Sequence, residues 1–258
     1  MSSREPLISC LCVTQRKPEL LGRAIDCFLG QTYPNKELVI LYEDDDAATE
    51  ALLAGGFARE SGIRVFRVPA YPKITLGELR NLAVRIARGE FICQWDDDDW
   101  YHIRRLEVQY EKLFQEGRHG SIMTQRLVFD VHTTTAYVSN ERLWEGSILC
   151  KKSVLQLKAY EDKALGEDTA TIEYLDHMGC LHQLHAMPWL YIYIYHGNNS
   201  GDQAHWSQIF RCSTALSPED SKSVASILQG GMSAGKASLL LDEILAPVMR
   251  SIGETKTI

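Results

Sequence analysis

Phe91-Ile92-Cys93-Gln94-Trp95-Asp96-Asp97-Asp98-Asp99-Trp100 is the stretch that decides the fold. Its apolar first half has the composition of a short buried strand, and four consecutive aspartates follow that strand. Neighbouring like charges repel each other, and capping the next helix would need only one aspartate. Carboxylate oxygens suit Mg²⁺ or Mn²⁺, which proteins hold with one or two carboxylates and the phosphates of a substrate. The run therefore predicts a site for a divalent cation and a phosphate, with an acidic helix cap as the alternative.

The residues before the aspartates alternate between strand and helix patterns, with short connections. This alternation is typical of an α/β domain with a parallel sheet. Predicted strands are Leu7–Thr14, Glu37–Tyr42, Ile63–Val68 and Phe91–Trp95, and predicted helices are Pro18–Gly30, an Ala/Leu segment to about Ser61, and Gly77–Arg88.

Three polar clusters follow the ends of predicted strands: Thr14–Arg16, Glu43–Asp46 and Asp96–Asp99. Ligands of open parallel sheets bind outside the carboxyl ends of the strands. The three clusters are therefore expected to line the rim of one binding site.

The residues after the aspartates also mix helix and strand patterns. The last helix, near Lys236–Ile252, is amphipathic and could pack on the body, on another subunit or on a membrane surface. Expected here are a helix over His102–Gln115, strands or a hairpin within Ser121–Val138, a strand Gly146–Cys150, a helix Glu167–Met178, a strand Pro188–Tyr195, a loop His196–Gly201 and a helical tail from about Ser217.

Composition excludes several classes of protein. The 258 residues are 45% hydrophobic and 24% charged, which is enough apolar material for a full core. The net charge is −7 without a basic block, so nucleic acid is not an expected partner. Seven scattered cysteines read as reduced thiols of a cytoplasmic protein, and neither a signal-peptide core nor a membrane-length apolar stretch is visible.

An ordered set of short motifs resembles the family 2 glycosyltransferases. The resemblance covers roughly residues 7 to 200. It implies a GT-A fold, a mixed and mostly parallel central sheet flanked by helices, with a nucleotide-sugar-binding half over 1–100 and an acceptor-binding half over 101–213. The helical extension expected over 214–258 has no counterpart in the resemblance. The matching pieces are Leu7-Ile8-Ser9 to Thr14-Gln15-Arg16, Gln31-Thr32-Tyr33-Pro34-Asn35, Leu38-Val39-Ile40-Leu41-Tyr42-Glu43-Asp44, Gly77-Glu78-Leu79-Arg80-Asn81, and Ala87-Arg88-Gly89-Glu90-Phe91-Ile92 before the aspartates.

The resemblance assigns different roles to the aspartates. It implies that Asp98 is a metal ligand and that Asp96 holds the ribose or a metal-bound water. Alternate residues of a strand share a face, which agrees with this pairing. Asp97 and Asp99 would support the site or cap the next helix. Some family members place a metal-ligating histidine where His196 stands, and an imidazole suits Mn²⁺ better than Mg²⁺.

A Glu-Asp pair, Glu167 and Asp168, opens a predicted helix. The resemblance implies that Asp168 is the general base that deprotonates the acceptor hydroxyl, with inversion at the anomeric carbon. The alternative is ordinary: acidic residues at a helix start are stabilised by the helix dipole.

The donor nucleotide is expected to meet residues at the strand ends and on the following helix. The family's second strand commonly ends in two aspartates followed by Gly-Ser, whereas this chain has Glu43-Asp44-Asp45-Asp46, so the base loop differs. UDP-sugars are the favoured donors. The expected donor contacts are Thr14, Arg16, Glu43, Asp44, Arg80, Asp96 and Asp97.

Trp144-Glu145-Gly146-Ser147 resembles the acceptor side of the family. Trp144 is expected either to stack on a sugar ring or to lie in the core. The acceptor would be a glycan or a lipid-linked sugar of cell-surface polysaccharide synthesis, which would place the enzyme in the cytoplasm, with peripheral membrane association or a homo-oligomer through the C-terminal helices.

Two motifs are rejected. His177, Cys180, His182 and His185 lack a second pair at zinc-ligand spacing, and Gly230–Lys236 lacks the Ser/Thr and the preceding strand of a P-loop.

Two other classes of protein fit parts of the pattern. A nucleotide-sugar-binding module without catalysis would bind donors and show no turnover. A metal-dependent nucleotidyltransferase also pairs aspartates in an α/β fold, but no glycine-rich, basic triphosphate loop is recognisable near Thr14.

Overall fold

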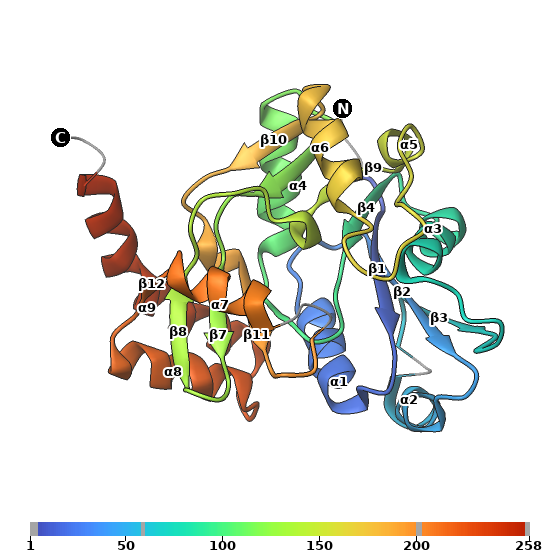
Figure 1. Cartoon of the computed structure of the whole chain (residues 1–258), viewed down its shortest axis with the longest axis horizontal. Helices are drawn as coiled ribbons and strands as arrows, with labels where there is room; N and C mark the ends of the chain where they lie inside the picture. Colours follow the sequence, from blue (N-terminus) through green and yellow to red (C-terminus); the bar gives the residue numbers. More distant parts are fainter. Residues whose placement is uncertain (1–4, 58–59, 200–202, 256–258) are drawn as a thin grey trace.

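The central strand β1, Ile8–Thr14, is buried along nearly its whole length, as a strand with helices on both sides must be. It belongs to a seven-stranded sheet with the order β10-β6-β9-β4-β1-β2-β3 in a computed structural model that describes residues 5–57, 60–199 and 203–255 (Figure 1). All neighbours pair in parallel except β9, which is antiparallel to β4 and β6. The other strands are β2 Lys36–Glu43, β3 Ile63–Val68, β4 Phe91–Gln94, β6 Gly120–Met123, β9 Leu149–Lys151 and β10 Leu181–Leu184.

Helices cover both faces of this sheet and create a core on each. Side chains alternate along β1: Cys10 and Cys12 point into one core, and Leu11 points into the other. Helices α1 and α4 pack on the first face, and α3, α5 and α6 pack on the second. This confirms the predicted α/β class with a mostly parallel sheet. Their bounds are α1 Pro18–Leu29, α3 Leu76–Ile86, α4 Arg105–Gln115, α5 Lys152–Leu155 and α6 Thr169–His177.

A second sheet of five strands, in the order β12-β8-β7-β11-β5, lies beside the first (Figure 1). The sequence indicated strands here but not a separate sheet. Strand β11 follows a 3-10 turn, Pro188–Leu190, and pairs in parallel with β7 and antiparallel with β5. The strands are β5 Trp100–Tyr101, β7 Leu127–Asp130, β8 Thr135–Val138, β11 Tyr191–Tyr195 and β12 Thr214–Ala215.

Several predicted elements differ in detail. The helix expected from His102 begins at Arg105, because the aspartates first lead into β5. The helix expected to reach Ser61 is short, α2 Ala47–Leu52 with a π-helical turn Leu53–Phe57, and the next two residues lie outside the described ones. Residues 145–147 form a 3-10 turn instead of a strand, and Ser200 and Gly201 of the predicted loop are outside the described residues. Helix α7, Gln203–Arg211, was not predicted.

The C-terminal helices α8, Pro218–Leu228, and α9, Ala234–Thr255, pack on the body. Val224 and Leu241 are fully buried in the same core as α1. Ser238 Oγ accepts the backbone N–H of Ile103 at 3.1 Å, and His102 Nε2 lies 3.4 Å from Asp242 Oδ2. Helix α9 therefore contacts the segment that follows the aspartates.

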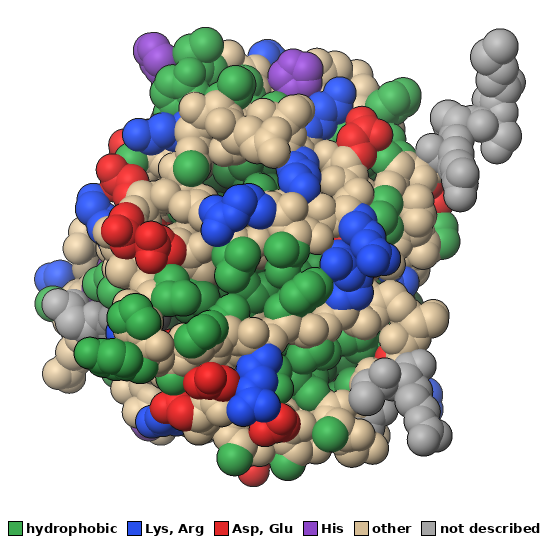
Figure 2. Space-filling view, turned by 90° about the vertical axis from the view of Figure 1, so that its right-hand side faces the viewer, with side chains coloured by type: hydrophobic (Ala, Val, Ile, Leu, Met, Phe, Trp, Pro, Cys, Tyr) green, Lys and Arg blue, Asp and Glu red, His purple; other side chains and the backbone are tan. Residues whose placement is uncertain are grey.

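The face of the molecule at the right of Figure 1 carries the edge strand β3. Arg64 pairs with Glu37 at 3.2 Å, and Arg67 pairs with Glu50 at 3.2 Å. Figure 2, which views this face, shows Lys and Arg side chains set among hydrophobic ones. Charged side chains on an exposed edge discourage pairing with other chains.

All seven cysteines are free thiols, and five of them are buried. Among the described residues, no helix has both the length and the apolarity needed to cross a membrane.

Gly77, near the start of α3, provides a test of how the loop before α6 is held in place. Its N–H donates to Lys163 O at 3.0 Å, and a Cβ at this position would lie 1.8 Å from Glu161 O. We expect Gly77→Ala to lower the free energy of unfolding by about 2 kcal/mol, the usual effect of overpacking, measured by urea denaturation. Gly22→Ala is the control, because nothing lies within 4 Å of its Cβ position in α1. Equal stabilities of the two variants would contradict the close fit of this loop.

Candidate active site

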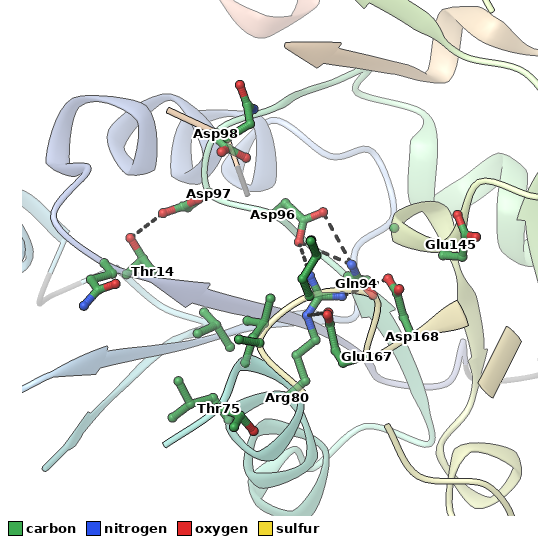
Figure 3. A pocket seen from close by; sticks show the side chains of 18 of the residues that line it. Thr14, Thr75, Arg80, Gln94, Asp96, Asp97, Asp98, Glu145, Glu167 and Asp168 are labelled. Carbon is green, nitrogen blue, oxygen red and sulfur yellow. Dashed lines mark hydrogen bonds and ion pairs between the residues drawn. The ribbon is translucent and has the colours of Figure 1, made fainter. Parts of the chain in front are cut away.

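A cavity of about 770 Å³ opens at the carboxyl ends of β1, β2 and β4. The predicted residues Thr14, Glu43, Arg80, Trp144 and Glu167 line it, together with Asp96, Asp97, Asp98 and Asp168. The labelled members of this set come from separate elements and approach each other around the cavity (Figure 3).

The first three aspartates face the cavity in different surroundings. Asp97 is 5% exposed and its Oδ2 accepts a hydrogen bond from Thr14 Oγ1 at 2.6 Å (Figure 3). Asp98 Oδ2 lies 2.7 Å from Lys17 Nζ and 3.0 Å from His196 Nε2. His196 thus reaches the site through Asp98, although it does not line the cavity wall itself.

Asp99 is not a helix cap. It is fully buried, and its carboxylate accepts hydrogen bonds from the Tyr191 hydroxyl and from the backbone N–H of Ile194, at 2.5 and 2.9 Å. Both partners belong to β11. Asp99 therefore fixes the aspartate run to the second sheet.

The surroundings separate the acidities of Asp97 and Asp98. Burial and the neighbouring charge of Asp98 raise the pKa of Asp97 to about 7. Burial opposes the ionisation of Asp98 as well, but the hydrogen bond from His196 and the Lys17 ammonium outweigh it and lower that pKa to about 2. Asp98 is consequently the more acidic member of the pair.

Arg80, on α3, connects two parts of the site. Its Nη2 lies 3.1 Å from Asp96 Oδ1, its Nε lies 3.1 Å from Glu167 Oε1, and its Nη1 lies 3.3 Å from Asp168 Oδ2 (Figure 3). The sequence offered Arg80 as a contact for the base or a phosphate. In the structure its donors face carboxylates instead.

Asp168 stands at the N-cap of α6, yet its side chain makes no capping hydrogen bond. Its position at the start of α6 is consistent with stabilisation by the helix dipole, and its carboxylate faces Arg80 in the cavity wall. Burial raises the pKa of Asp168, and Arg80 partly opposes this increase. A higher pKa makes a carboxylate a stronger base.

The part of the cavity at the end of β2 contains Glu43 but not its neighbour. Glu43 accepts hydrogen bonds from Lys73 Nζ and from Gln15 Nε2, the latter at 2.6 Å. Contrary to expectation, Asp44 and Arg16 do not line the cavity. Asp44 Oδ1 accepts the N–H of Ala70 at 2.9 Å, and Arg16 pairs with exposed Asp45 at 2.7 Å, because both side chains leave the strand ends away from the cavity.

Trp144 belongs to the core. Trp144 is only 1% exposed. The guanidinium carbons of Arg126 and Arg142 lie 3.9 and 4.7 Å from its ring centroid. A sugar has no free ring face on which to stack, so the packing alternative applies. The adjacent Gly146 is close to the aspartates, since a Cβ there would lie 3.0 Å from Asp96 Oδ2.

The donor set fits a divalent cation that is completed by substrate oxygens. Asp98 and His196 offer one carboxylate and one imidazole side by side, which suits Mn²⁺. Among the described residues, no group of three His, Cys, Asp or Glu side chains is arranged to hold a metal. The remaining ligands would have to come from phosphate or water.

Comparisons with known proteins agree with this geometry. Residues 9–169 match the family model described as "Glycosyl transferase family 2". The chain belongs to glycosyl transferase family 2. EpsE of Bacillus subtilis is 29% identical over 127 residues, 48% of this chain and 45% of EpsE. The amylovoran biosynthesis glycosyltransferase AmsB of Erwinia amylovora is 30% identical over 108 residues, 37% of this chain and 35% of AmsB. The matched segments thus span less than half the length of these curated relatives.

Solved structures confirm the GT-A fold of this family 2 chain. TarS from S. aureus in complex with UDP gives a TM-score of 0.59 at 13% identity, covering 97% of this chain and 75% of TarS. The mannosyltransferase PcManGT from Pyrobaculum calidifontis, in complex with GDP-Man and Mn²⁺, gives a TM-score of 0.60 at 12% identity. This match covers 98% of this chain and 80% of PcManGT.

Several cavity residues of this family 2 chain were not predicted. Lys17 had a usable signal, since it directly follows the polar cluster after β1. Lys73 and Arg126 lie on segments without a motif, and only the folded chain brings them to the cavity.

The acidity of Asp97 predicts a pH dependence of stability in this family 2 chain. A folded pKa of about 7, above the ordinary 3.8, means that ionised Asp97 disfavours the fold. Its effect is absent below about pH 4 and grows as the pH rises to about 7. Without added metal, Asp97→Asn should be more stable than the wild type at pH 8, by on the order of 2 kcal/mol, and equal to it near pH 4, measured by urea denaturation.

The exposed Asp45 serves as the control, since its side chain is 47% exposed. Asp45→Asn should show no such pH-dependent difference. A stability difference for Asp97→Asn that is constant between pH 4 and 8 would contradict the raised pKa.

Proposed function

We propose that this chain is a metal-dependent, inverting glycosyltransferase that moves a sugar from a nucleotide-diphosphate donor to an acceptor hydroxyl. The main support is that one cavity contains both the aspartates and the Glu167-Asp168 pair, with Arg80 between them. Membership of family 2 supports the same reaction. UDP-sugars are the favoured donors, and TarS is described in complex with UDP and with UDP-GlcNAc.

In this mechanism Asp168 accepts the proton of the acceptor hydroxyl on a carboxylate oxygen. The acceptor oxygen then bonds to the anomeric carbon as the bond from that carbon to the diphosphate breaks, so that attack from the opposite side inverts the configuration. Arg80 orients Asp168 through its Nη1 at 3.3 Å, and burial strengthens the base by raising its pKa.

The donor would be held by residues at the strand ends. Lys17 offers an ammonium group beside Asp98, where the negative diphosphate would lie. Asp96 and Asp97 would contact the ribose, and Glu43 would accept an N–H of the base. Asp98 and His196 would hold Mn²⁺ or Mg²⁺, which would supply charge neutralisation for the leaving diphosphate.

Cell-surface polysaccharide synthesis is the proposed setting, with a glycan or a lipid-linked sugar as the acceptor. The relatives support it, because AmsB is named for amylovoran biosynthesis and WcaA of Escherichia coli for colanic acid biosynthesis. We further propose a cytoplasmic location, peripheral at the inner face of the membrane.

A thermal-shift screen of nucleoside diphosphates and nucleotide sugars, with and without Mn²⁺, tests the donor class. A ligand at one hundred times its Kd should stabilise the fold by about 2.7 kcal/mol. We expect UDP and a UDP-sugar to raise the Tm only when Mn²⁺ is present. Stabilisation by nucleoside triphosphates with release of pyrophosphate would instead indicate a nucleotidyltransferase.

Two variants separate binding from catalysis. Asp98→Ala should abolish the Mn²⁺-dependent Tm shift and the release of nucleoside diphosphate. Asp168→Asn should bind the donor within about threefold of the wild type but lose at least about one hundredfold in transfer, the usual loss of a general base. Binding is measured by calorimetry and transfer by nucleoside diphosphate release with an acceptor panel.

Asp162→Asn is the matched control, because this carboxylate hydrogen-bonds to Thr75 and does not line the cavity. Near-normal transfer by Asp168→Asn would exclude Asp168 as the base. Donor binding without turnover by the wild type would favour a non-catalytic binding module.

A further inference from the structure

Arg126, between β6 and β7, is a buried cation in the wall of the cavity. The residue is only 5% exposed. Its guanidinium carbon lies 3.7 Å from the ring centroid of Tyr193 and 3.9 Å from that of Trp144. Aromatic faces attract a cation, so the rings hold the guanidinium in place.

No carboxylate of the described residues forms an ion pair with Arg126. Among the described residues, Arg126 Nε has no hydrogen-bond partner, and Trp144 Nε1 has none either. Asp99 feels the positive charge of Arg126, but its carboxylate accepts its hydrogen bonds from β11. A buried charge without a hydrogen-bonded partner is unfavourable.

Two neighbouring arginines make hydrogen bonds through their guanidinium groups. Arg105, also buried against aromatic rings, donates to Gln94 O and to Gln109 Oε1, although its Nη1 has no partner among the described residues. Arg142, over the same Trp144 ring, makes two hydrogen bonds to the Glu145 carboxylate, at 2.8 and 3.0 Å. Arg126 therefore has a hydrogen-bond donor without an acceptor, and the residue lines a cavity large enough for a substrate.

We propose that Arg126 and the indole N–H of Trp144 form an anion subsite that binds an oxyanion of a substrate, either a phosphate or a carboxylate. The planar guanidinium presents paired donors that match such groups, and two donors without an acceptor select a ligand that accepts hydrogen bonds. The source of the oxyanion is an acidic group of the acceptor or the diphosphate of the donor.

The surroundings favour the acceptor. Arg126, Trp144 and Tyr193 come from the half of the chain that carries the second sheet, whereas Thr14 and Glu43 are the last residues of β1 and β2. The acceptor class would then be a sugar that carries a phosphate or a carboxylate. This inference rests on the proposed transferase function.

The test uses the full chain and two variants at this position. Arg126→Gln removes the charge, and Arg126→Lys keeps the charge but loses the planar pair of donors. The probes are orthophosphate and D-glucuronate, with D-glucose as the neutral counterpart, each added at constant ionic strength in the presence of saturating UDP and Mn²⁺. The readouts are calorimetry and the indole N–H resonance of Trp144, assigned with Trp144→Phe.

For an acidic acceptor, the anions should bind beside UDP and shift the Trp144 resonance, whereas D-glucose should not. Arg126→Gln should lower the affinity for the anions at least tenfold and keep the affinity for UDP within threefold of the wild type. If the subsite instead binds the diphosphate of the donor, Arg126→Gln should lower the affinity for UDP itself at least tenfold. Arg104→Gln is the control and should change neither affinity more than threefold, because Arg104 pairs with Glu107 and does not line the cavity.

The subsite is overturned if Arg126→Gln, or Arg126→Lys where the first variant does not fold, binds UDP and the anions as the wild type does. It is also overturned if no anion and no UDP shifts the Trp144 resonance of the wild type. Failure of UDP-sugars to bind or turn over would contradict the transferase itself. Normal donor turnover with unchanged anion affinity would contradict only the subsite.

Discussion

The contact of one guanidinium with three carboxylates is the constraint on which the site depends. Arg80 lies between Asp96, which follows β4, and the Glu167-Asp168 pair at the start of α6. Its side chain is 12% exposed, so solvent screens these contacts little. Without this cation, the two acidic groups would repel each other across the cavity. With it, elements far apart in the sequence form a single wall.

The packing around Arg80 explains why its position is fixed. The loop before α6 lies against the start of α3, where Gly77 leaves room for the backbone of Glu161. Asn81, one residue after Arg80, exchanges hydrogen bonds with the backbone of Tyr160 at 2.9 and 3.1 Å. The ring of Tyr160 lies 5.9 Å from the Arg80 guanidinium carbon. Helix α3 and this loop therefore hold Arg80 and Asp168 as one unit.

Much of the fold could be predicted from the sequence because strand and helix periodicities are local. The stretch Ile63–Val68 was predicted to the residue, and the strand before the aspartates to within one residue. Strand β5 could not be predicted, because Trp100–Tyr101 becomes a strand only by pairing with β11. The separate second sheet was missed for the same reason.

The site was predictable where a short motif carries the chemistry. The aspartate run and Asp168 were named from sequence, and the structure brings them to one cavity. Side-chain direction after a strand end was not predictable, which is why Arg16 and Asp44 were expected at the cavity although they lie outside it. Arg126 had no motif at all, and only the folded structure shows that its buried Nε lacks a hydrogen-bond partner among the described residues.

The position of α9 also affects how the protein can be made. Leu241 and Leu245 fill the same core as Phe28 of α1, although most of the chain separates them. A growing chain emerges from the ribosome with its N-terminal part first, so that core stays incomplete until α9 has been synthesised. During that interval the apolar face of α1 has no C-terminal partner and is open to association with other chains. The nascent protein is therefore expected to depend on chaperones more than a chain whose early strands and helices complete their own core.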